Sequence, residues 1–491
     1  MIRRRTALFP RGRIRETLTQ VHAYLSAQGV SAYLVGGYLR DHLVGRASRD
    51  IDVAVGGDGL ELARALAGQV GGKLVVLDEP GGVARLVFGR GSASWHLDIA
   101  GFSGTIQQDL ARRDFTLNAL ALELGDALSN HVSLLDPFGG QKDLEARAIR
   151  SVSEAAFTSD PVRLLRGMRL ARQLSFSLVP ETSEQMRRHS SLISRVAGER
   201  VREELNGLMA QPGAGQAFLC LHSLGLLEPL LPELTTCEGI EQPKEHHWDV
   251  FHHSIEAVSA AEGLLRQASG PPAALLAPWD DRLQGHFQVH VAAGVPRWLL
   301  LKWAALFHDL GKPSAKTIEA GGRIRFLGHA RVGSGQVRAI MSRLRFSNKE
   351  ADYVAILVEH HMRPAELIHL QPPSRRAIYR YFRDTGEGGL DVLFLFLADY
   401  MATCGPSLDL ERWRQDVGRM ASLIAGHFEE KEAVPVPKLL DGHDIMKRFQ
   451  LSPGPLLGRL LEAVREAQGA GEVSNREEAL ALAGRLLKEG D

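Results

Sequence analysis

The stretch YLVGGYLRDHLVGRASRDIDVAV, residues 33–55, decides the fold of the first part of the chain. It predicts a strand that runs into Gly36 and Gly37, a short helix, and a second strand that carries Asp50 and Asp52. Side chains two positions apart on a strand lie on the same face, so the two carboxylates point the same way. Convergent carboxylate oxygens are the ligands that Mg²⁺ prefers, and they leave positions open for phosphate oxygens. The stretch therefore predicts a pair of catalytic metal ligands.

The glycines and an arginine of this stretch add the features of a triphosphate site. Gly36 and Gly37 have no Cβ, so their backbone N–H groups can approach phosphate oxygens closely. Arg40, on the intervening helix, can add charge-assisted hydrogen bonds. A lone Asp-x-Asp or Gly-Gly is common in ordinary turns, but the two in this order and spacing favour nucleotidyl transfer by a two-metal scheme.

The bulk composition is that of a globular protein with several domains. The chain has 491 residues, of which 44% are hydrophobic and 24% charged, and this length predicts roughly two to four domains. Lys and Arg together number 58, as do Asp and Glu. This balance disfavours non-specific coating of nucleic acid but allows a local basic groove. The separated Cys220, Cys237 and Cys404 fit neither a disulfide framework nor a thiolate zinc site, and they indicate a reducing compartment.

The sequence also predicts a cytoplasmic protein with no membrane partner. Its most apolar run, residues 298–307, is short and is interrupted by Lys302. The Arg-rich, acid-free start MIRRRTALFPRGRIR is typical of a basic arm that leads into the first helix, with a transit peptide as the alternative. None of these features indicates an oligomeric state.

Short β-type runs alternate with helical runs at first, and helical periodicity dominates the rest of the chain. AYLVGG, DIDVAV, KLVVLD, ARLVFG and WHLDIA predict an α+β fold for the first part. Within the later helical part, ASGPPAALLAPWDD reads as an insertion or mobile loop. The expected domains are a head at 1–150, a helical neck at 151–240, a His-rich helical domain at 241–405 and a helical tail at 406–491.

Two arginine-containing motifs follow the strands of the head. RRDFTLN contains Arg112 and Arg113, and one of these arginines can reach ribose or phosphate. Asp114 of the same motif can cap and brace the backbone. SDPVR opens a helix with Asp160 near its start and Arg163 one turn later. Taken alone, each motif is also explained as a capped helix with solvated arginines.

Hydrogen-bond chemistry gives Asp160 and Arg163 a functional interpretation. Cytosine and adenine present an amino donor beside a ring-nitrogen acceptor, whereas uracil and guanine present a carbonyl acceptor beside an N–H donor. An ionised Asp only accepts and an Arg only donates. The pair therefore matches C or A, and it leaves buried polar groups unpaired against U or G. A pair of protein side chains would then replace a nucleic-acid template.

These motifs resemble the bacterial-type (class II) CCA-adding tRNA nucleotidyltransferases and the related poly(A) polymerases of the DNA polymerase beta superfamily. The resemblance covers residues 33–209 and rests on LVGGYLRD, GRASRDIDVAV, DLARRDFTLNALAL, LLDPFGGQKDLEARAIR and SDPVRLLRGMRLARQLSF. It implies a polymerase-beta-like head with a mixed sheet, all-α regions behind it, Mg²⁺ as cofactor, tRNA as partner, and CTP with ATP as substrates. It implies Asp50 and Asp52 as catalytic metal ligands, and as nucleotide-binding residues Gly36, Gly37, Arg40, Arg112, Arg113, Asp160, Arg163, Arg166 and Arg169.

Two departures from the family pattern bear on which nucleotides are added. The family usually has an acidic residue before the base-reading Asp, bracing the arginine, and here that position is Ser159. Residues 98–109, DIAGFSGTIQQD, are short where full CCA-adding relatives carry a longer loop that accompanies the switch from CTP to ATP, typically with an arginine near Ser103. An enzyme that adds only the two cytidines is therefore an alternative to full CCA addition.

The helical region behind the neck contains scattered His and Asp side chains with apolar neighbours. Such ligands from several helices can hold one or two divalent ions with an open substrate position, although any single histidine is more simply a structural residue. The HDLGK segment changes that balance, and residues 246–399 resemble the HD superfamily of metal-dependent phosphohydrolases. The resemblance implies Mn²⁺, Ni²⁺ or a similar ion, with Lys312 near phosphate. The implied metal ligands are His253, His308, Asp309, His329, His360 and Asp399.

Two further functions stay open from the sequence. A poly(A) polymerase would use the same head and neck, but its bacterial members typically carry a basic tail, and EEALALAGRLLKEGD is not strongly basic. The chain could instead be chiefly an HD phosphohydrolase whose head only binds RNA. Asp50, Asp52 and Asp160 disfavour that third interpretation.

Overall fold

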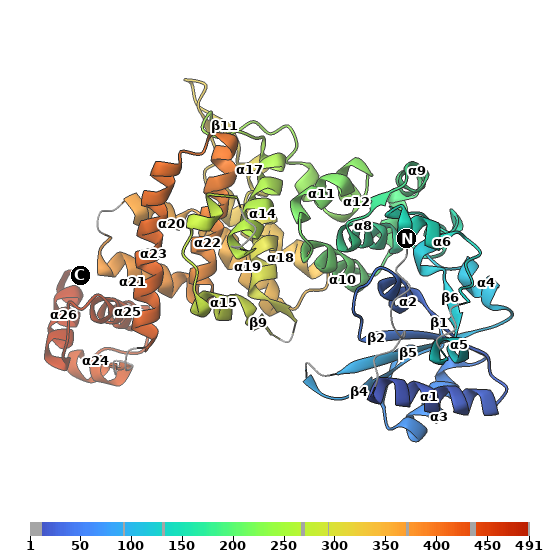
Figure 1. The fold of residues 1–491 in the computed structure, drawn as a ribbon. Helices are drawn as coiled ribbons and strands as arrows, with labels where there is room; N and C mark the ends of the chain where they lie inside the picture. The colour runs from blue at the N-terminus through green and yellow to red at the C-terminus, as the bar shows by residue number, and fades with distance from the viewer. Residues whose placement is uncertain are drawn as a thin grey trace. The chain divides into compact units, whose positions relative to one another are not determined.

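The computed structural model describes residues 12–91, 94–129, 133–266, 271–292, 294–369, 373–432 and 438–489. The chain folds into two compact units: the first is made of Met1–Gln211 and Leu221–Leu230, and the second of Pro212–Cys220 and Leu231–Asp491 (Figure 1). Most of the expected N-terminal basic arm, residues 1–11, and the first part of the expected insertion, residues 268–270, lie outside the described residues.

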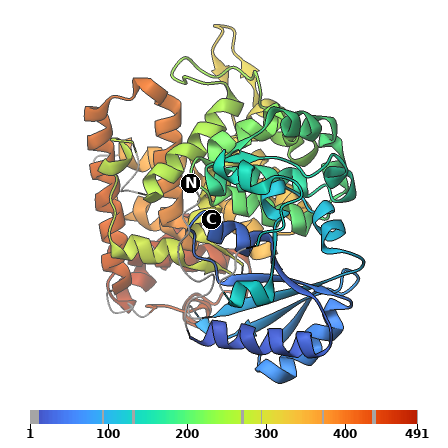
Figure 2. The same cartoon turned by 45° about the vertical axis from the view of Figure 1, so that its right-hand side comes forward.

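The head contains a six-stranded sheet with the strand order β3-β4-β5-β2-β1-β6. β2 pairs with β5 in parallel and the other neighbouring strands are antiparallel, so the sheet is mixed, as expected. Helix α3 packs against β4 and β5, with α1 beside it (Figure 1, Figure 2). The strands are β1 (Ala32–Val35), β2 (Asp50–Gly56), β3 (Lys73–Asp78), β4 (Val83–Phe88), β5 (Trp95–Phe102) and β6 (Ala121–Glu123). The helices are α1 (Arg13–Ala27), α2 (Gly36–Leu43), α3 (Gly59–Val70), α4 (Ile106–Ala111), α5 (Leu124–Leu128) and α6 (Gly140–Glu145).

The local sequence explains how the central strands meet the helices. On β2, Ile51 and Val53 are buried at 1% exposure each, and Asp50 and Asp52 alternate with them on the opposite face. After β5, Thr105 and Gln108 form a capping box that starts α4 at once. The short connection expected between Asp98 and the RRD motif is therefore a tight strand-to-helix turn.

Helix α8 (Arg163–Leu174) is the centre of the neck and packs against α10 (Gly198–Met209). Its apolar face is buried, as the helical periodicity predicts, through Leu164, Leu165, Met168 and Ala171. The other neck elements are β7 (Ala148–Ile149), which pairs in parallel with β8 (Ser177–Leu178), α7 (Ala155–Ser159), α9 (Pro180–Arg188), the 3₁₀ helix η3 (Ser190–Arg195) and α12 (Leu227–Leu230). Helix α11 (Ala214–Ser223) spans the division between the units.

The second unit is built on helices α14, α16, α19 and α22, which pack against one another. Its helices are α13 (Pro232–Thr235), α14 (Val250–Arg266), α15 (Asp281–Gln288), α16 (Arg297–Phe307), α17 (Lys312–Ala315), α18 (His329–Arg343), α19 (Asn348–His360), α20 (Arg363–His369), α21 (Arg375–Thr385), α22 (Gly389–Cys404) and α23 (Leu410–Glu432). Two antiparallel ribbons join β9 (His290–Val291) to β10 (Val295–Pro296) and β11 (Thr317–Ile318) to β12 (Ile324–Arg325).

One segment of the described residues, Arg375–Ser407, is long and apolar enough to cross a membrane by length and composition alone. In its most apolar window 61% is buried inside the protein, where α22 forms part of the helical core. The expectation that residues 298–307 are the most apolar run is therefore wrong. In that run, Lys302 is buried and its ammonium lies 3.0 Å from the carboxylate of Glu262.

The last three helices form a small module with its own apolar core, α24 (Gly442–Phe449), α25 (Pro455–Gly469) and α26 (Arg476–Glu489). The final helix falls inside the segment GEVSNREEALALAGRLLKEG, as expected. Helix α25 packs on α21, and Glu466 of α25 pairs with Arg376 and Arg380 of α21 at 3.1 and 2.5 Å.

Candidate functional site

The turn between β1 and α2 holds the second aspartate of the Asp-x-Asp pair. Gly36 has a φ of 64°, in the left-handed region, and a Cβ there would lie 3.1 Å from Asp52 Oδ2 and 3.2 Å from Arg113 Nη1. The backbone N–H of Tyr38 donates to Asp52 Oδ2 at 3.0 Å. Glycine is required at this turn because a side chain would strain the backbone and crowd the carboxylate.

Three carboxylates lie on the adjacent strands β2 and β5. The parallel register sets Asp52 opposite Asp98 and Asp50 opposite His96, and paired residues of neighbouring strands share a face. Arg85 on β4 donates two hydrogen bonds to Asp98, at 2.7 and 2.8 Å. His96 Nδ1 lies 2.7 Å from Asp50 Oδ1. The sequence motifs did not identify Asp98 as a ligand, yet the strand pairing places it with the other two.

The electrostatic setting of Asp52 favours a cation beside it. Burial raises the pKa of Asp52, and the negative charge of Asp98 raises it further. The Tyr38 N–H bond and the charges of Arg113 and Arg40 lower it, but the net shift is upward. Because a divalent ion reverses this kind of shift, the paired carboxylates and their all-oxygen donor set fit a hard cation such as Mg²⁺.

One cavity of about 310 Å³ extends from these carboxylates to the neck. Asp52 and Asp98 line it from the sheet, with Gly36 and Gly37 from the turn before α2. From the neck, Arg163 and Arg166 of α8 line the same cavity. The carboxylates of the sheet and the arginines of the neck thus share one space.

The expected nucleotide-binding arginines of the head differ in position. Arg113 lines the cavity and is held by Asp109 at 3.0 Å. The side chain of Arg112 is 64% exposed and lies 3.8 Å from the same aspartate. Arg40 is 5% exposed and lies outside the cavity lining. It donates to Asn118 Oδ1 at 2.9 Å and pairs with its neighbour Asp41. Of the three, Arg113 is the one that lines the cavity.

Asp114 links the head motif to the neck. It is buried, and its Oδ1 accepts hydrogen bonds from the backbone N–H of Phe115 and from Asn118 Nδ2, at 2.7 and 3.0 Å. Its Oδ2 lies 3.5 Å from Arg166 Nη1. Burial raises the pKa of Asp114, but Arg166 and these hydrogen bonds lower it by more, so the net shift is downward. The carboxylate is therefore kept ionised beside the cavity.

Asp160 and Arg163 lie together at the start of α8. Asp160 Oδ2 lies 3.8 Å from Arg163 Nε and accepts a hydrogen bond at 2.8 Å from Arg200 Nη2 on α10. Two polar atoms of the pair, Asp160 Oδ1 and Arg163 Nε, are buried without a hydrogen-bond partner among the described residues. Buried polar groups in native proteins are almost always paired, so these two atoms have bonding capacity left for another polar group. Arg163 lines the cavity, whereas Asp160 lies outside its lining.

The other two neck arginines share one buried carboxylate, that of Glu204 on α10. Arg166 Nε donates to Glu204 Oε1 at 2.9 Å, and Arg169 Nε donates to Oε2 at 2.6 Å. Arg166 lines the cavity, whereas Arg169 lies outside its lining and donates to Gln173 at 2.9 Å. Arg169 therefore supports Glu204 from outside the cavity lining, whereas the sequence predicted that it lines the pocket.

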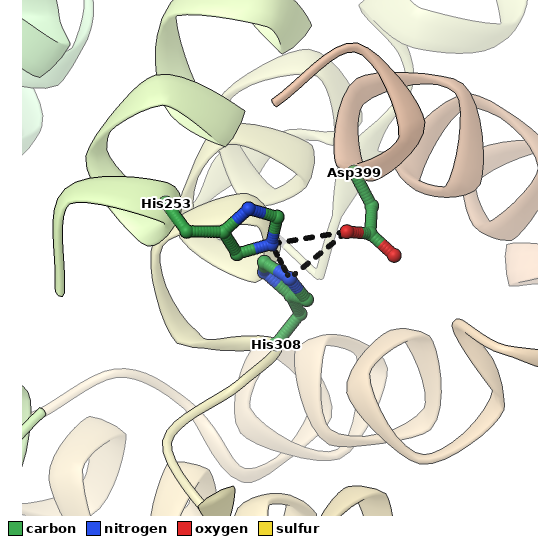
Figure 3. Close-up of side chains that lie close together, drawn as sticks. All are labelled: His253, His308 and Asp399. Carbon is green, nitrogen blue, oxygen red and sulfur yellow. Dashed lines mark hydrogen bonds and ion pairs between the residues drawn. The ribbon is translucent and has the colours of Figure 1, made fainter. Parts of the chain in front are cut away.

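The second unit brings together the histidines and aspartates expected to bind metal. His253 comes from α14, His308 follows α16 and Asp399 lies on α22, and the three side chains converge (Figure 3). His253 Nε2 lies 3.0 Å from His308 Nε2 and 3.0 Å from Asp399 Oδ1. Asp309 Oδ2 is 3.3 and 3.2 Å from the same two ring nitrogens.

A second group of possible ligands adjoins the first through Asp309. Its Oδ1 lies 3.4 Å from His329 Nε2 and 3.9 Å from His361 Nε2. The structure corrects the expectation for His360, which is half-buried and belongs to neither ligand group of the described residues. Its neighbour His361 takes that place, because it follows the end of α19 and its ring is 2% exposed.

The histidine rings are oriented by backbone carbonyls. His308 Nδ1 donates to Ala305 O at 2.9 Å, His329 Nδ1 to Phe326 O at 2.7 Å, and His361 Nδ1 to Val358 O at 2.7 Å. A carbonyl only accepts, so each Nδ1 carries a proton and each Nε2 faces the cluster. Outer hydrogen bonds of this kind are the usual support of metal-binding histidines.

The charge balance of this cluster also fits a cation. Lys312 Nζ lies 2.6 Å from Asp309 Oδ2 and donates to Gln242 Oε1. Burial lowers the pKa of His308, but Asp309 and Asp399 raise it by more, to about 10. The buried carboxylates thus attract positive charge at the point where the ring nitrogens meet. Nitrogen and oxygen donors together fit a transition-metal ion better than Mg²⁺.

Three family models match the chain. They are the Poly A polymerase head domain over residues 32–150, the Probable RNA and SrmB-binding site of polymerase A over 175–237, and the HD domain over 250–403. A mixed-sheet head with three carboxylates on adjacent strands, joined by one cavity to an arginine-bearing neck, defines a nucleotidyltransferase.

Curated relatives match nearly the whole chain. The A-adding tRNA nucleotidyltransferase of Deinococcus radiodurans is 37% identical over 469 residues, which cover 93% of this chain and 96% of that protein. The CC-adding tRNA nucleotidyltransferase of Thermus thermophilus is 34% identical over 459 residues, with 92% of each chain covered. The chain therefore belongs to the tRNA nucleotidyltransferase family.

Solved structures share the fold at lower identity. The Thermotoga maritima CCA-adding enzyme complexed with tRNA has a TM-score of 0.57 at 19% identity, with 96% of this chain and 95% of that one covered. A CCA-adding enzyme with ATP has a TM-score of 0.62, also at 19% identity and with the same coverage.

Proposed function

We propose that the first unit adds nucleotides to the 3′ end of tRNA without a nucleic-acid template, using CTP and ATP. The observation that carries this proposal is the single cavity lined by Asp52 and Asp98 at one end and by Arg163 at the other. A nucleoside triphosphate has the same polarity, with its phosphates at one end and its base at the other. The relatives of A-adding and CC-adding type support the choice of substrate.

In this proposal Asp160 and Arg163 read the base. The unpartnered Asp160 Oδ1 would accept from the amino group of C or A, and Arg163 would donate to the ring nitrogen. Uracil or guanine would set acceptor against acceptor and donor against donor, which leaves buried polar atoms unpaired. Arg113 and Arg166, which line the same cavity, are placed to bind phosphate or ribose oxygens.

Mg²⁺ is the proposed cofactor of this site, held by Asp50, Asp52 and Asp98. When bound it would activate the 3′-hydroxyl and stabilise the leaving pyrophosphate. We propose the domain division 1–150, 151–240, 241–405 and 406–491, with tRNA held by phosphate contacts of the helical parts that read its shape. We also infer a cytoplasmic location, which the free cysteines among the described residues support.

The test uses three tRNA transcripts, ending before CCA, after the first C and after CC, each supplied with one labelled nucleotide at a time. Incorporation of C on the first two and of A on the third would establish full CCA addition. Incorporation of C alone would define a CC-adding enzyme, and incorporation of A on the third transcript alone would define an A-adding enzyme. Long adenosine tails would instead make the chain a poly(A) polymerase and refute the proposal.

We propose phosphohydrolase activity as a second function, carried by the cluster of His253, His308, Asp309 and Asp399. The specific observation is that Asp309 contacts both groups of possible ligands, His308 through Oδ2 and His329 through Oδ1. The two adjoining groups could therefore hold one or two ions. Mn²⁺ or Ni²⁺ is the proposed metal, because the donors are mixed imidazole and carboxylate.

Hydrolysis of 2′,3′-cyclic nucleotides with Mn²⁺ or Ni²⁺ tests the second function. Activity should vanish in a His308→Ala, Asp309→Ala double variant and persist in Asp52→Ala, which alters only the head. If the parent protein hydrolyses neither cyclic nucleotides nor simple phosphomonoesters, the cluster has a structural role and the second function is wrong.

A further inference from the structure

The base-reading aspartate has a charged partner on a different helix. Arg200 of α10 donates from Nη2 to Asp160 Oδ2 at 2.8 Å, and the side chain of Asp160 is 22% exposed. Arg163, three residues along the chain, is farther away, with its Nε 3.8 Å from the same oxygen. Asp160 is therefore held by Arg200 more closely than by its reading partner.

The hydrogen-bond partners of Arg163 near Asp160 are neutral and distant, and Arg163 and Asp114 also attract each other through space. Arg163 Nη1 donates to Ala156 O at 3.3 Å and to Ser159 Oγ at 3.4 Å. Ser159 Oγ itself donates to Ala156 O at 3.2 Å, so it offers the arginine only a weak acceptor. Position 159 supplies no negative charge that would hold Arg163 away from Asp160.

We propose that Arg200 is a positioning residue that keeps Asp160 and Arg163 apart and so sets the discrimination of C and A from U and G. This inference rests on the proposed function of the first unit. Arg200 engages one oxygen of Asp160 and leaves the other, Oδ1, for the base. Its side chain is 50% exposed, and it makes its contact from outside the cavity lining.

The physical reason lies in competition for one carboxylate. Without Arg200, the nearest cation to Asp160 is Arg163, and their long 3.8 Å ion pair can shorten into a direct hydrogen-bonded one. Each would then satisfy the other, and neither would present a free acceptor or donor to the incoming base. The correct base would lose its hydrogen bonds, while a wrong base would no longer leave buried groups unpaired, so selectivity would fall from both sides.

The experiment measures kcat and KM for CTP, ATP, UTP and GTP, each supplied singly to a tRNA transcript that the parent extends. In Arg200→Ala, we expect the ratio of kcat/KM for the correct base over UTP or GTP to fall by about ten- to a hundredfold. Most of the change should appear as a higher KM for the correct nucleotide. Arg200→Lys should restore much of the ratio, because the observed contact is a single hydrogen bond that an ammonium can replace.

A second substitution separates positioning from folding. Ser159→Glu would give Arg163 an acidic partner, since Ser159 Oγ already lies within 3.4 Å of it, and it should recover discrimination in the Arg200→Ala background. Arg195→Ala, which removes an exposed neck arginine, is the matched control and should leave the ratio unchanged. Thermal melts of all variants check that they are folded.

The outcomes distinguish a failure of the proposed function from a failure of the role of Arg200. A parent that extends no tRNA overturns the proposed function. A parent that prefers C or A, together with an Arg200→Ala variant that keeps the same preference, overturns the role of Arg200 alone. The role is also overturned if Arg200→Ala loses discrimination but neither Arg200→Lys nor the added Ser159→Glu recovers any of it.

Discussion

The transferase site and the histidine cluster both contain carboxylates suited to metals, but they hold them in opposite ways. In the head, the Asp50 side chain is 60% exposed, and Asp52 and Asp98 face a cavity that arginines also line. In the second unit, His253 and His308 are completely buried, and backbone carbonyls fix the orientation of three of the rings.

This difference predicts which site has enough ligands to hold its metal before a substrate binds. Mg²⁺ is usually bound by one or two carboxylates together with substrate phosphates, so the head should bind its metal firmly only with a triphosphate present. The histidine cluster already contains six possible ligand side chains, and its metal should stay bound without substrate.

Asp52→Ala should separate the two sites most sharply. The substitution removes one of the proposed metal ligands. It should lower the rate of tRNA extension by at least about a thousandfold, because metal ions contribute several kcal/mol to this chemistry. The metal content of the histidine cluster, measured by mass spectrometry, should not change. Glu79→Ala, an exposed carboxylate of the same domain, is the control. Extension that survives in Asp52→Ala would refute the metal assignment.

Glu262→Ala should destabilise the second unit by about 3 kcal/mol, as measured by urea unfolding. Glu262 lies 3.0 Å from the buried ammonium of Lys302 and accepts hydrogen bonds from the backbone N–H groups of Gly213 and Ala214 at 2.8 and 3.3 Å. Its helix, α14, also carries His253, so the buried cluster depends on this frame. Glu262→Gln keeps an acceptor for the backbone amides and should cost less.

The same pair gives the stability a pH dependence. Burial raises the pKa of Glu262, but Lys302 and the two backbone amides lower it by more. A carboxylate with a lowered folded pKa contributes stability above its unfolded pKa of about 4.3, and this contribution is lost as the pH falls through the folded value. The parent should therefore lose stability below about pH 4 more steeply than Glu262→Gln. Equal acid slopes for the two proteins would contradict the assignment.

His361→Ala and His360→Ala should differ although the residues are neighbours. We expect removal of His361 to weaken metal binding by about ten- to a hundredfold, since its ring nitrogen faces Asp309. The His360 substitution should leave binding unchanged. Titration of the apoprotein with Mn²⁺ or Ni²⁺ measures both, and a larger effect at His360 would restore the sequence-based choice.

The smallest effect is expected at Arg112. Its exposed side chain makes only a 3.8 Å contact with Asp109, so Arg112→Ala should change kcat/KM for CTP by less than about threefold. Arg113→Ala removes a cavity-lining charge and should lower the same quantity by about tenfold or more. A larger loss of kcat/KM in Arg112→Ala than in Arg113→Ala would show that the nucleotide contacts the exposed side of the end of α4.

The sequence predicted the mixed-sheet head and the shared face of Asp50 and Asp52, because strand alternation is a local rule. It did not reveal Asp98, whose role depends on β5 pairing with β2 and not on any motif around it. Non-local pairing is the part of a fold that a single sequence encodes least directly.

The structure favours Arg113 over Arg112 and His361 over His360 for a common physical reason. Both lie at helix ends, where a shift of one residue turns a side chain by about a quarter of a turn around the helix axis. Arg113 and His361 face the sites because α4 and α19 end where they do. The motif predicted the residue types, and the choice between neighbours depends on where the backbone of each helix ends.

The parallel pairing of β2 with β5 also constrains the chain during its synthesis. The segment between these strands must cross over before Asp52 meets Asp98, so a nascent chain that ends at β4 carries the Asp-x-Asp pair without the third carboxylate. Contacts between distant segments form late, since loop closure must precede them. A nascent polypeptide that ends before β5 would therefore not yet consume nucleotide, and competence for transfer would arrive with the folding of the whole head.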